Sequence, residues 1–245
     1  MLYNFQGGAD GANPYAGLIF DAHGALYGAA SGGGATGNGT VFKLTPPTTS
    51  GGAWADTILH SFTGADGREP YIPLVFDAQG ALYGAAYFGG ASNQSVVFKL
   101  SPPAAPSGKW KYAVLYQFTG KTDGANPMGL IFDKSGTLYG TAAFGAISNW
   151  GVVFHLTPPS SGVGAWTETV IHSFTSDGYT PYGGVMFGQM ARSTARPSPA
   201  AACAQQQRKG FAASSTNCFR RRPGPPCGPS RSCTAFWAIT RLPSM

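Results

Sequence analysis

Apolar and polar positions alternate along this chain in short runs that are separated by turn-forming residues. Residues 54–62 alternate and are rich in β-forming side chains, residues 74–76 form a short apolar run, and residues 82–87 and 96–100 are again apolar. Runs of this length, bounded by Asp, Gly and Pro, are typical of β-strands. No helical period of useful length accompanies them. The pattern therefore predicts a unit of four short strands.

The same block of sequence occurs three times. Residues 21–28 (DAHGALYG) return as residues 77–84 (DAQGALYG) and as residues 133–140 (DKSGTLYG). The steps are 77 − 21 = 56 and 133 − 77 = 56 residues. A VFKL-like run, a Pro pair and a Trp recur in the same phase. A constant period in a chain rich in Gly and aromatic residues indicates tandem supersecondary units.

The repeat predicts an all-β fold, a partial β-propeller-like array of four-stranded repeats followed by a disordered tail. Residues 77–80 have the Asp and Gly of a hairpin turn. Pro102 and Pro103 end the fourth strand, because proline donates no ladder hydrogen bond. One four-stranded sheet per repeat is typical of a propeller blade. The coil of a β-solenoid is usually shorter, and a sandwich would not repeat its sequence.

Composition divides the chain into two parts. We expect tandem β-repeats over residues 1–187, as about three full copies and a fragment, and a low-complexity basic tail over residues 188–245. Seven of the 16 Lys and Arg residues and all 10 Asp and Glu residues precede residue 191, so the repeats carry about 7 − 10 = −3 and the tail holds 16 − 7 = 9 basic residues. A segment of this kind buries too little apolar surface to offset its ordering entropy. We therefore expect disorder in the tail.

Two alternatives explain the tail. It is either an authentic basic extension or a frameshifted piece of further repeats, because selected codons for residues 232–237 spell a Leu-His-Ser-Phe motif in another frame. A basic tail favours nucleic acid or anionic membrane as a partner, but no nucleic-acid-binding module is present, and we expect no nucleic acid for the repeats. The chain has no basic segment followed by an apolar core at its start. We therefore expect the intact protein to begin upstream of Met1.

Hydrophobic run length and cysteine spacing argue against a membrane-spanning helix and a zinc site. No apolar run approaches the roughly 18 residues of a membrane-spanning helix, so no transmembrane segment is expected. The 4 cysteines all lie in the tail, at positions 203, 218, 227 and 233. No Cys-x-x-Cys pair occurs among them, which argues against zinc. We expect no metal and no cofactor.

The tandem pattern resembles the choice-of-anchor tandem repeat GloVer-containing proteins of bacteria. The resemblance covers about residues 1–187 and rests on Phe62, Asp66-Gly67, Pro70, Phe76-Asp77, Gly80, Leu82-Tyr83-Gly84 and residues 97–100, with their counterparts in the other copies. It implies an exported or surface-attached protein with many repeats, a variable C-terminal anchor and no catalytic residues. The chain itself shows neither an export signal nor an anchor.

Aromatic residues are the candidate ligand-binding residues. A Tyr recurs beside glycine in each copy, and a Trp follows each Pro pair; these residues are Tyr27, Tyr83, Tyr139, Trp54, Trp110 and Trp166. Rings on one face of a propeller would stack on sugars or flat ligands. Packing between blades is the alternative, and recurrence in every unit favours it because a shared core requires it.

The acidic and histidine positions have structural explanations. Asp21, Asp77 and Asp133 lie in turns, and the dense oxygen-rich spacing of a calcium loop is absent, so turn formation is the preferred interpretation. His60 takes the place of Tyr3 and Tyr116 in other copies, which indicates packing or a modest hydrogen bond. Zinc-helix and nucleophile-elbow motifs are absent.

These observations favour a binding or scaffold module at the cell surface or outside the cell, with carbohydrate or another surface protein as its partner. Loops on a rigid scaffold would make the contacts. The alternatives are a secreted β-propeller enzyme acting on carbohydrate, which needs acid and base groups aimed into one pocket, and a truncated gene product without function.

Overall fold

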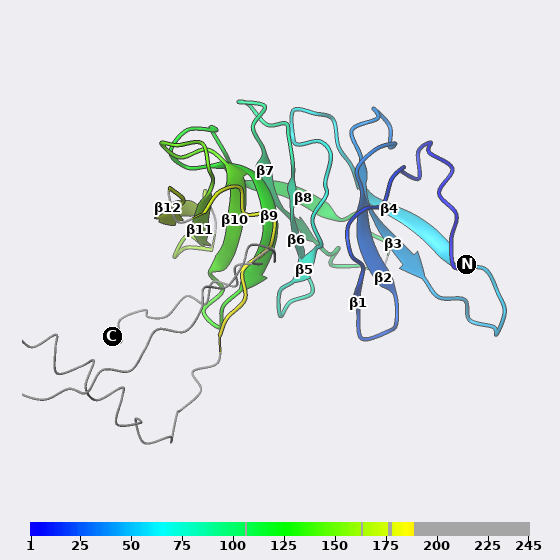
Figure 1. The fold of residues 1–245 in the computed structure, drawn as a ribbon. Coiled ribbons are helices and arrows are strands. Elements are labelled where there is room, and N and C mark those ends of the chain that lie inside the picture. Colours follow the sequence, from blue (N-terminus) through cyan, green and yellow to red (C-terminus); the bar gives the residue numbers. More distant parts are fainter. Residues whose placement is uncertain (106, 163, 176–177, 189–245) are drawn as a thin grey trace, which may run out of the picture. The chain divides into compact units, whose positions relative to one another are not determined.

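The computed structural model describes residues 1–105, 107–162, 164–175 and 178–188, and these residues form strands and no helix. The first sheet contains β1 (Ile19–Phe20), β2 (Leu26–Ala30), β3 (Thr40–Thr45) and β4 (Ala55–Ser61). The second contains β5 (Val75–Phe76), β6 (Leu82–Ala86), β7 (Val96–Ser101) and β8 (Lys111–Gln117). The third contains β9 (Ala125–Phe132), β10 (Leu138–Phe144), β11 (Val152–Thr157) and β12 (Thr167–Ser173). Figure 1 shows the three sheets in order along the chain.

Each sheet is an antiparallel meander in which neighbours in sequence are neighbours in space. The register is the same in all three: Gly28 lies opposite Phe42, Gly84 opposite Phe98, and Gly140 opposite Phe154. The ladder between the third and fourth strands of each sheet also shifts at the equivalent place, beside that Phe. The structure therefore confirms the predicted all-β array of four-stranded repeats.

A glycine opposite the Phe lets the ring lie close to the backbone. A Cβ atom on Gly84 would lie 2.6 Å from the Cζ atom of Phe98 and 2.7 Å from a methyl group of Leu74. Contacts this short are not tolerated in a packed interior. The strand that carries Gly84 is buried along its whole length, so the glycine serves the packing between β6 and its neighbours.

Consecutive sheets pack through an aromatic pair that recurs with the repeat. Phe62, directly after β4, lies edge-on to Phe98 of β7 with ring centroids 5.3 Å apart. Phe118 meets Phe154 in the same way at 5.1 Å. Phe62, Phe98 and Phe154 have at most 1% of their surface exposed. The core is thus divided between sheet interfaces, as expected for units that cannot bury their apolar faces alone.

The first strand of the third sheet differs from its counterparts. β1 and β5 have 2 residues each, whereas β9 has 8. The segment from proline to the buried leucine is one residue shorter here, since 130 − 127 = 3 whereas 74 − 70 = 4. β9 pairs with β10 on both sides of a register shift between Thr141 and Ala142. The sequence pattern did not predict this longer strand.

Some predictions concern residues outside the described part of the chain. The predicted boundary at residues 187/188 stays a prediction. Outside the described part lie the order of residues 189–245 and the cysteines, which stay predictions too. Asp177, the last of the recurring Asp-Gly positions, is also outside it. Among the described residues, no helix has the length and apolarity needed to cross a bilayer.

Candidate functional site

The hairpin between β5 and β6 is held by its aspartate. Oδ1 of Asp77 accepts the backbone N–H groups of Gln79 at 2.9 Å and Ala81 at 2.8 Å. Oδ2 of the same carboxylate accepts the hydroxyl of Tyr83 at 3.1 Å. Asp21 and Asp133 accept the equivalent backbone N–H groups in their own hairpins. The structure therefore gives these aspartates the predicted turn-forming role.

A lysine completes this cluster on β7. The Lys99 ammonium lies 3.5 Å from Oδ2 of Asp77 and 5.0 Å from the centre of the Tyr83 ring. Burial alone would lower the pKa of Lys99, but the Tyr83 hydroxyl and the Asp77 carboxylate outweigh burial and raise it. Burial raises the pKa of Tyr83, which therefore stays a neutral donor. In the first sheet, the ammonium of Lys43 lies 5.3 Å from the Tyr27 ring centre.

The predicted Tyr and Trp residues meet across sheet boundaries. Tyr83 of the second sheet lies edge-on to Phe132, with centroids 4.8 Å apart, and 6.0 Å from the ring of Trp166, both in the third repeat. Tyr27 makes the same contacts one repeat earlier, with Phe76 at 5.2 Å and Trp110 at 6.1 Å. Both tyrosines are 4% exposed. Their rings are thus part of the packing between sheets.

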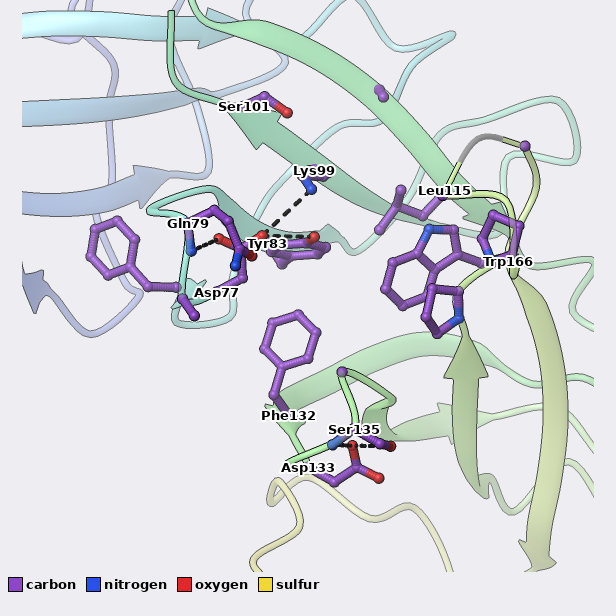
Figure 2. Close-up of a pocket in the computed structure, with 18 of the residues that line it drawn as sticks. Asp77, Gln79, Tyr83, Lys99, Ser101, Leu115, Phe132, Asp133, Ser135 and Trp166 are labelled. Atoms are coloured by element: carbon purple, nitrogen blue, oxygen red, sulfur yellow. Dashed lines mark hydrogen bonds and ion pairs between the residues drawn. The ribbon is translucent and has the colours of Figure 1, made fainter. Parts of the chain in front are cut away.

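A groove of about 770 Å³ opens beside the contacts of Tyr83 with Phe132 and Trp166, between the second and third sheets (Figure 2). Its aromatic wall is made by Phe76, Tyr83, Phe132 and Trp166. Its polar lining comes from the β5–β6 and β9–β10 hairpin turns and from strands β7 and β8. These residues are Asp77, Gln79, Lys99, Ser101, Lys111, Asp133, Lys134 and Ser135. The size falls in the range of roughly 300–1,000 Å³ that is typical of ligand sites. We call this the β6–β12 groove.

The six aromatic residues singled out from the sequence have different positions. Tyr83 and Trp166 line the β6–β12 groove, while Trp110 borders a separate pocket of about 420 Å³ beside β4. Trp54 packs on the buried side chains of the first sheet. Tyr139 lies edge-on to His155 with centroids 5.5 Å apart. The structure brings Tyr27 and Tyr83 next to the Trp of the following repeat rather than gathering all six.

Sequence reasoning missed the lysines of the groove. Lys111 begins β8 and Lys134 is the second residue of the β9–β10 hairpin, so they are far apart along the chain. Both side chains line the β6–β12 groove. A comparison of equivalent repeat positions contained the signal, because the earlier copy has Ala55 and Ala78 there, since 111 − 55 = 56 and 134 − 78 = 56.

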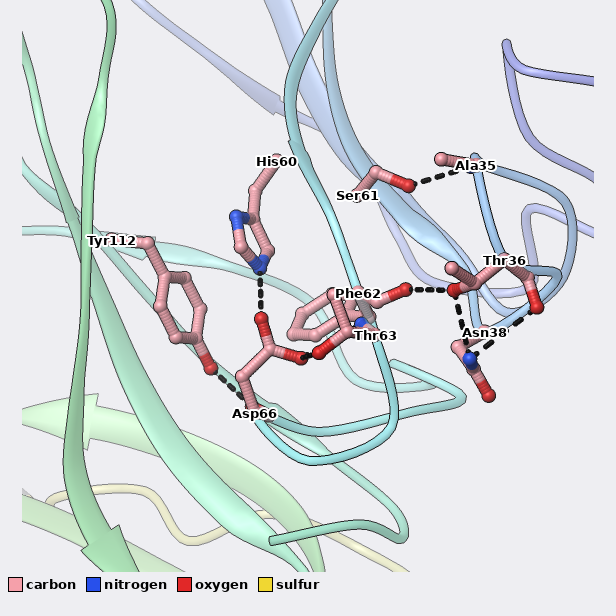
Figure 3. A network of polar contacts seen from close by, with 9 residues as sticks. All are labelled: Ala35, Thr36, Asn38, His60, Ser61, Phe62, Thr63, Asp66 and Tyr112. Atoms are coloured by element: carbon pink, nitrogen blue, oxygen red, sulfur yellow. Dashed lines mark hydrogen bonds and ion pairs between the residues drawn. The ribbon is translucent and has the colours of Figure 1, made fainter.

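A second polar site lies on the loop after β4 (Figure 3). Nε2 of His60 is 2.9 Å from Oδ2 of Asp66, and Oδ1 of Asp66 accepts both the N–H and the hydroxyl of Thr63 at 2.8 Å. Tyr112 stacks on the His60 ring with centroids 3.9 Å apart and donates its hydroxyl to the Asp66 carbonyl at 2.5 Å. Burial lowers the pKa of His60, although Asp66 opposes this effect.

The same loop recurs with tyrosine in place of histidine. The hydroxyl of Tyr3 donates to Asp10 at 3.2 Å, and the hydroxyl of Tyr116 donates to Asp123 at 3.1 Å. In each copy the aspartate also accepts backbone N–H groups of its own loop. The prediction that the His60 position serves packing and a hydrogen bond is confirmed, and nothing in this geometry requires a catalytic histidine.

Glu168 on β12 faces the third copy of this loop. Burial and the neighbouring Asp123 carboxylate raise the pKa of Glu168 to about 7. Oε1 of Glu168 is buried and has no hydrogen-bond partner within the part of the chain that the structure describes. Both carboxylates line a cavity of about 330 Å³ that contains no aromatic side chain. The sequence offered no signal for this pair, because the two residues are 45 positions apart, 168 − 123.

Metal-binding geometry is not found among the described residues. No group of three or more His, Cys, Asp and Glu side chains converges there. The carboxylates of the hairpin turns are directed to backbone N–H groups instead.

A sequence profile of the Gloeobacter/Verrucomicrobia repeat matches residues 1–193. The chain belongs to this repeat family. The match spans all three sheets. A search of curated proteins found no match.

Proposed function

We propose that this repeat protein is a binding module of the bacterial cell surface and that its ligand is a carbohydrate bound in the β6–β12 groove. The observation that carries the proposal is the composition of the groove, which combines an aromatic wall with polar groups from two turns. Aromatic rings stack on the apolar faces of sugars, and a few polar side chains set the orientation of the ligand. Such a division between apolar wall and polar rim suits a pyranose ring.

Rigidity supports this assignment. Trp166 is held against Tyr83, and Tyr83 is held by Asp77 through its hydroxyl. Asp133 anchors the opposite turn through the backbone of Ser135 and Thr137. A preformed wall reduces the ordering cost of binding. Another surface protein is the alternative partner, and it would need a broad apolar patch rather than a groove.

A carbohydrate-active enzyme is the second candidate. Its acid would be Glu168, whose pKa is raised to about 7, and its base the neighbouring Asp123. However, Asp123 accepts hydrogen bonds from Thr119, Tyr116 and the Lys121 backbone, and the pair lines a cavity without a ring on which a sugar would stack. Binding in the β6–β12 groove is therefore the better-supported proposal.

Substitution of Trp166 tests the proposal. The probe is the oligosaccharide that binds best in a panel of neutral and acidic oligosaccharides. We expect Trp166→Ala to lower the affinity for this probe by about 10-fold, the effect of losing one stacking contact of ~1.4 kcal/mol. The measurement is isothermal titration calorimetry on the full chain. Trp110→Ala is the matched control, because Trp110 contacts Tyr27 in the same way but does not line the groove.

Three results would contradict the proposal. The first is equal loss with both variants, which would indicate a general effect on the fold. The second is absence of binding to any oligosaccharide in the panel, as the truncated product without function would show. The third is turnover of an oligosaccharide that Glu168→Gln abolishes, which would favour the enzyme. The proposed location is checked separately by protease accessibility of the protein on intact cells.

A further inference from the structure

Cationic side chains distinguish the β6–β12 groove from the equivalent positions of the first and second repeats. Among the described residues, Lys99, Lys111 and Lys134 line it, and Asp77 and Asp133 are its acidic residues, so the formal charge of this lining is 3 − 2 = +1. At the equivalent positions one repeat earlier the charged residues are Lys43, Asp21 and Asp77, which give 1 − 2 = −1. The two positions that cause the difference carry Ala55 and Ala78 there.

The fold does not require these two lysines. Ala55 lies opposite Thr45 at the start of β4, and Lys111 lies opposite Ser101 at the start of β8, so the backbone is the same with either side chain. Lys134 follows the turn aspartate just as an alanine does in the earlier hairpin. Both lysines are exposed. They therefore vary in a repeat whose aromatic and turn residues are constant.

Both acidic side chains of the groove already have partners. Asp77 pairs with Lys99, 3.5 Å away, and accepts three hydrogen bonds from its own repeat. Oδ1 of Asp133 accepts the N–H and hydroxyl of Ser135 at 2.8 and 2.7 Å and the N–H of Thr137 at 2.9 Å. Burial alone would raise the pKa of Asp133, but these hydrogen bonds lower it, so the carboxylate stays ionised in its turn.

Two of the lysine ammonium groups differ from these partnered carboxylates because, in the part of the chain that the structure describes, they are not engaged in an ion pair. Within the described residues, Lys111 and Lys134 form no ion pair, whereas Lys99 does. Lysine stems are long and flexible, and because both residues are exposed their charged ends stay in contact with water. Among the described residues, an anion entering the groove would therefore find two lining lysines that form no ion pair.

From these observations we infer that the ligand of the β6–β12 groove is an anionic glycan, whose carboxylate or sulfate groups pair with Lys111 and Lys134 while a sugar ring stacks on the aromatic wall. This inference rests on the proposed carbohydrate-binding function and adds the charge of the ligand. Charge-assisted contacts of this kind are stronger than neutral ones and weaken with salt. The equivalent positions one repeat earlier, Ala55 and Ala78, offer no such cations.

The first experiment compares three probes on the full chain by titration calorimetry. They are oligogalacturonate, its methyl-esterified neutral form, and an oligosaccharide whose negative charges are sulfate groups alone. We expect an anionic probe to bind about 10-fold more tightly than the neutral form at low salt, the effect of one charge-assisted contact, and to lose this advantage in 0.5 M salt. Lowering the pH towards 3 distinguishes binding through a carboxylate from binding through a sulfate, since only the carboxylate becomes protonated in this range.

The second experiment removes the cations. The variant Lys111→Ala/Lys134→Ala should lose the preference for the anionic probe and keep its affinity for the neutral one. The charge-matched control is Lys109→Ala/Lys121→Ala, because both of these lysines are exposed and lie outside the groove. The control should bind like the unmodified chain. Circular dichroism checks that both variants keep the β-fold.

The outcomes separate the two proposals. Equal affinity for neutral and anionic probes, or an unchanged preference in the Lys111/Lys134 variant, overturns the anionic ligand while the groove still binds sugar. Failure of every probe to bind, or binding that Trp166→Ala leaves unchanged, overturns the carbohydrate-binding function of the groove itself. Loss of preference in the control variant as well would assign the effect to overall charge and also overturn the inference.

Discussion

The first and second sheets have nearly the same sequence and the same register, yet the same face is buried differently in the two. Leu74, before β5, is 1% exposed, whereas its counterpart Leu18 is 45% exposed. Phe20 is 68% exposed, whereas Phe76 is partly buried against Tyr27 of the preceding sheet. The difference is the neighbour, because among the described residues only the second and third sheets have this face covered by another sheet.

The comparison shows that the strand pattern and the burial of its side chains are separate properties. The pattern sets which side chains point to a given face, and the neighbouring sheet decides whether that face is buried. Apolar burial is worth roughly 25 cal/mol per Å². A given substitution should therefore cost more in the second sheet than in the first.

The largest expected effect is on the ring that joins two sheets. We expect Phe98→Ala to lower the free energy of unfolding by about 3–5 kcal/mol, the usual cost of removing a fully buried Phe. Phe42→Ala should cost less, because Phe42 is covered by Phe5, which is itself only partly buried. Urea unfolding followed by fluorescence measures both. Equal losses would show that the neighbouring sheet does not decide the contribution of this ring.

A smaller effect is expected from an added methyl group opposite the same rings. Gly84→Ala should cost about 1–3 kcal/mol, because its Cβ meets Phe98 and the buried Leu74. Gly28→Ala meets the equivalent atoms of Phe42 and Leu18, but the exposed Leu18 side chain has room to rotate away. Thermal unfolding of the two variants compares them directly. A larger loss for Gly28→Ala would contradict the comparison.

The smallest effect concerns one position that differs among the sheets. Glu168 stands where the second sheet has Tyr112, and its pKa is raised from 4.5 to about 7, by burial first and then by Asp123. The folded state therefore binds more protons than the unfolded chain between these values. Its contribution to stability is complete below about pH 4.5 and is lost as the pH rises through 7.

Glu168→Gln tests this contribution. The glutamine variant should lose stability less steeply than the unmodified chain between pH 4.5 and 7, because its side chain does not titrate. The measurement is the urea midpoint across this range. Glu69→Gln is the control, since Glu69 lies in a loop of another repeat. An unchanged slope for Glu168→Gln would show that the Glu168 carboxyl group is not held protonated by the fold.

Much of the fold was predictable because its determinants are local. The run of residues 82–87 and the Asp-Gly hairpin at residues 77–80 indicated a strand and its turn, and both are observed within about one residue. The exchange of His60 for tyrosine in other copies indicated a shared hydrogen bond, which the structure shows. The candidate site was less predictable. Trp166 and Tyr83 were singled out, but not that a Tyr meets the Trp of the following repeat.

The sequence by itself determined the period, the strands, the turns and the family of this protein. The strands and turns depend on contacts within one repeat, and the period and the family follow from the recurrence of that pattern. Only the tertiary structure decided that Lys111 and Lys134 line one groove with Trp166, that Glu168 faces Asp123, and that Leu74 is buried while Leu18 is not. The physical reason is the same in each case. Burial and electrostatic environment depend on atoms from the neighbouring sheet, and a pattern within one repeat carries no information about them.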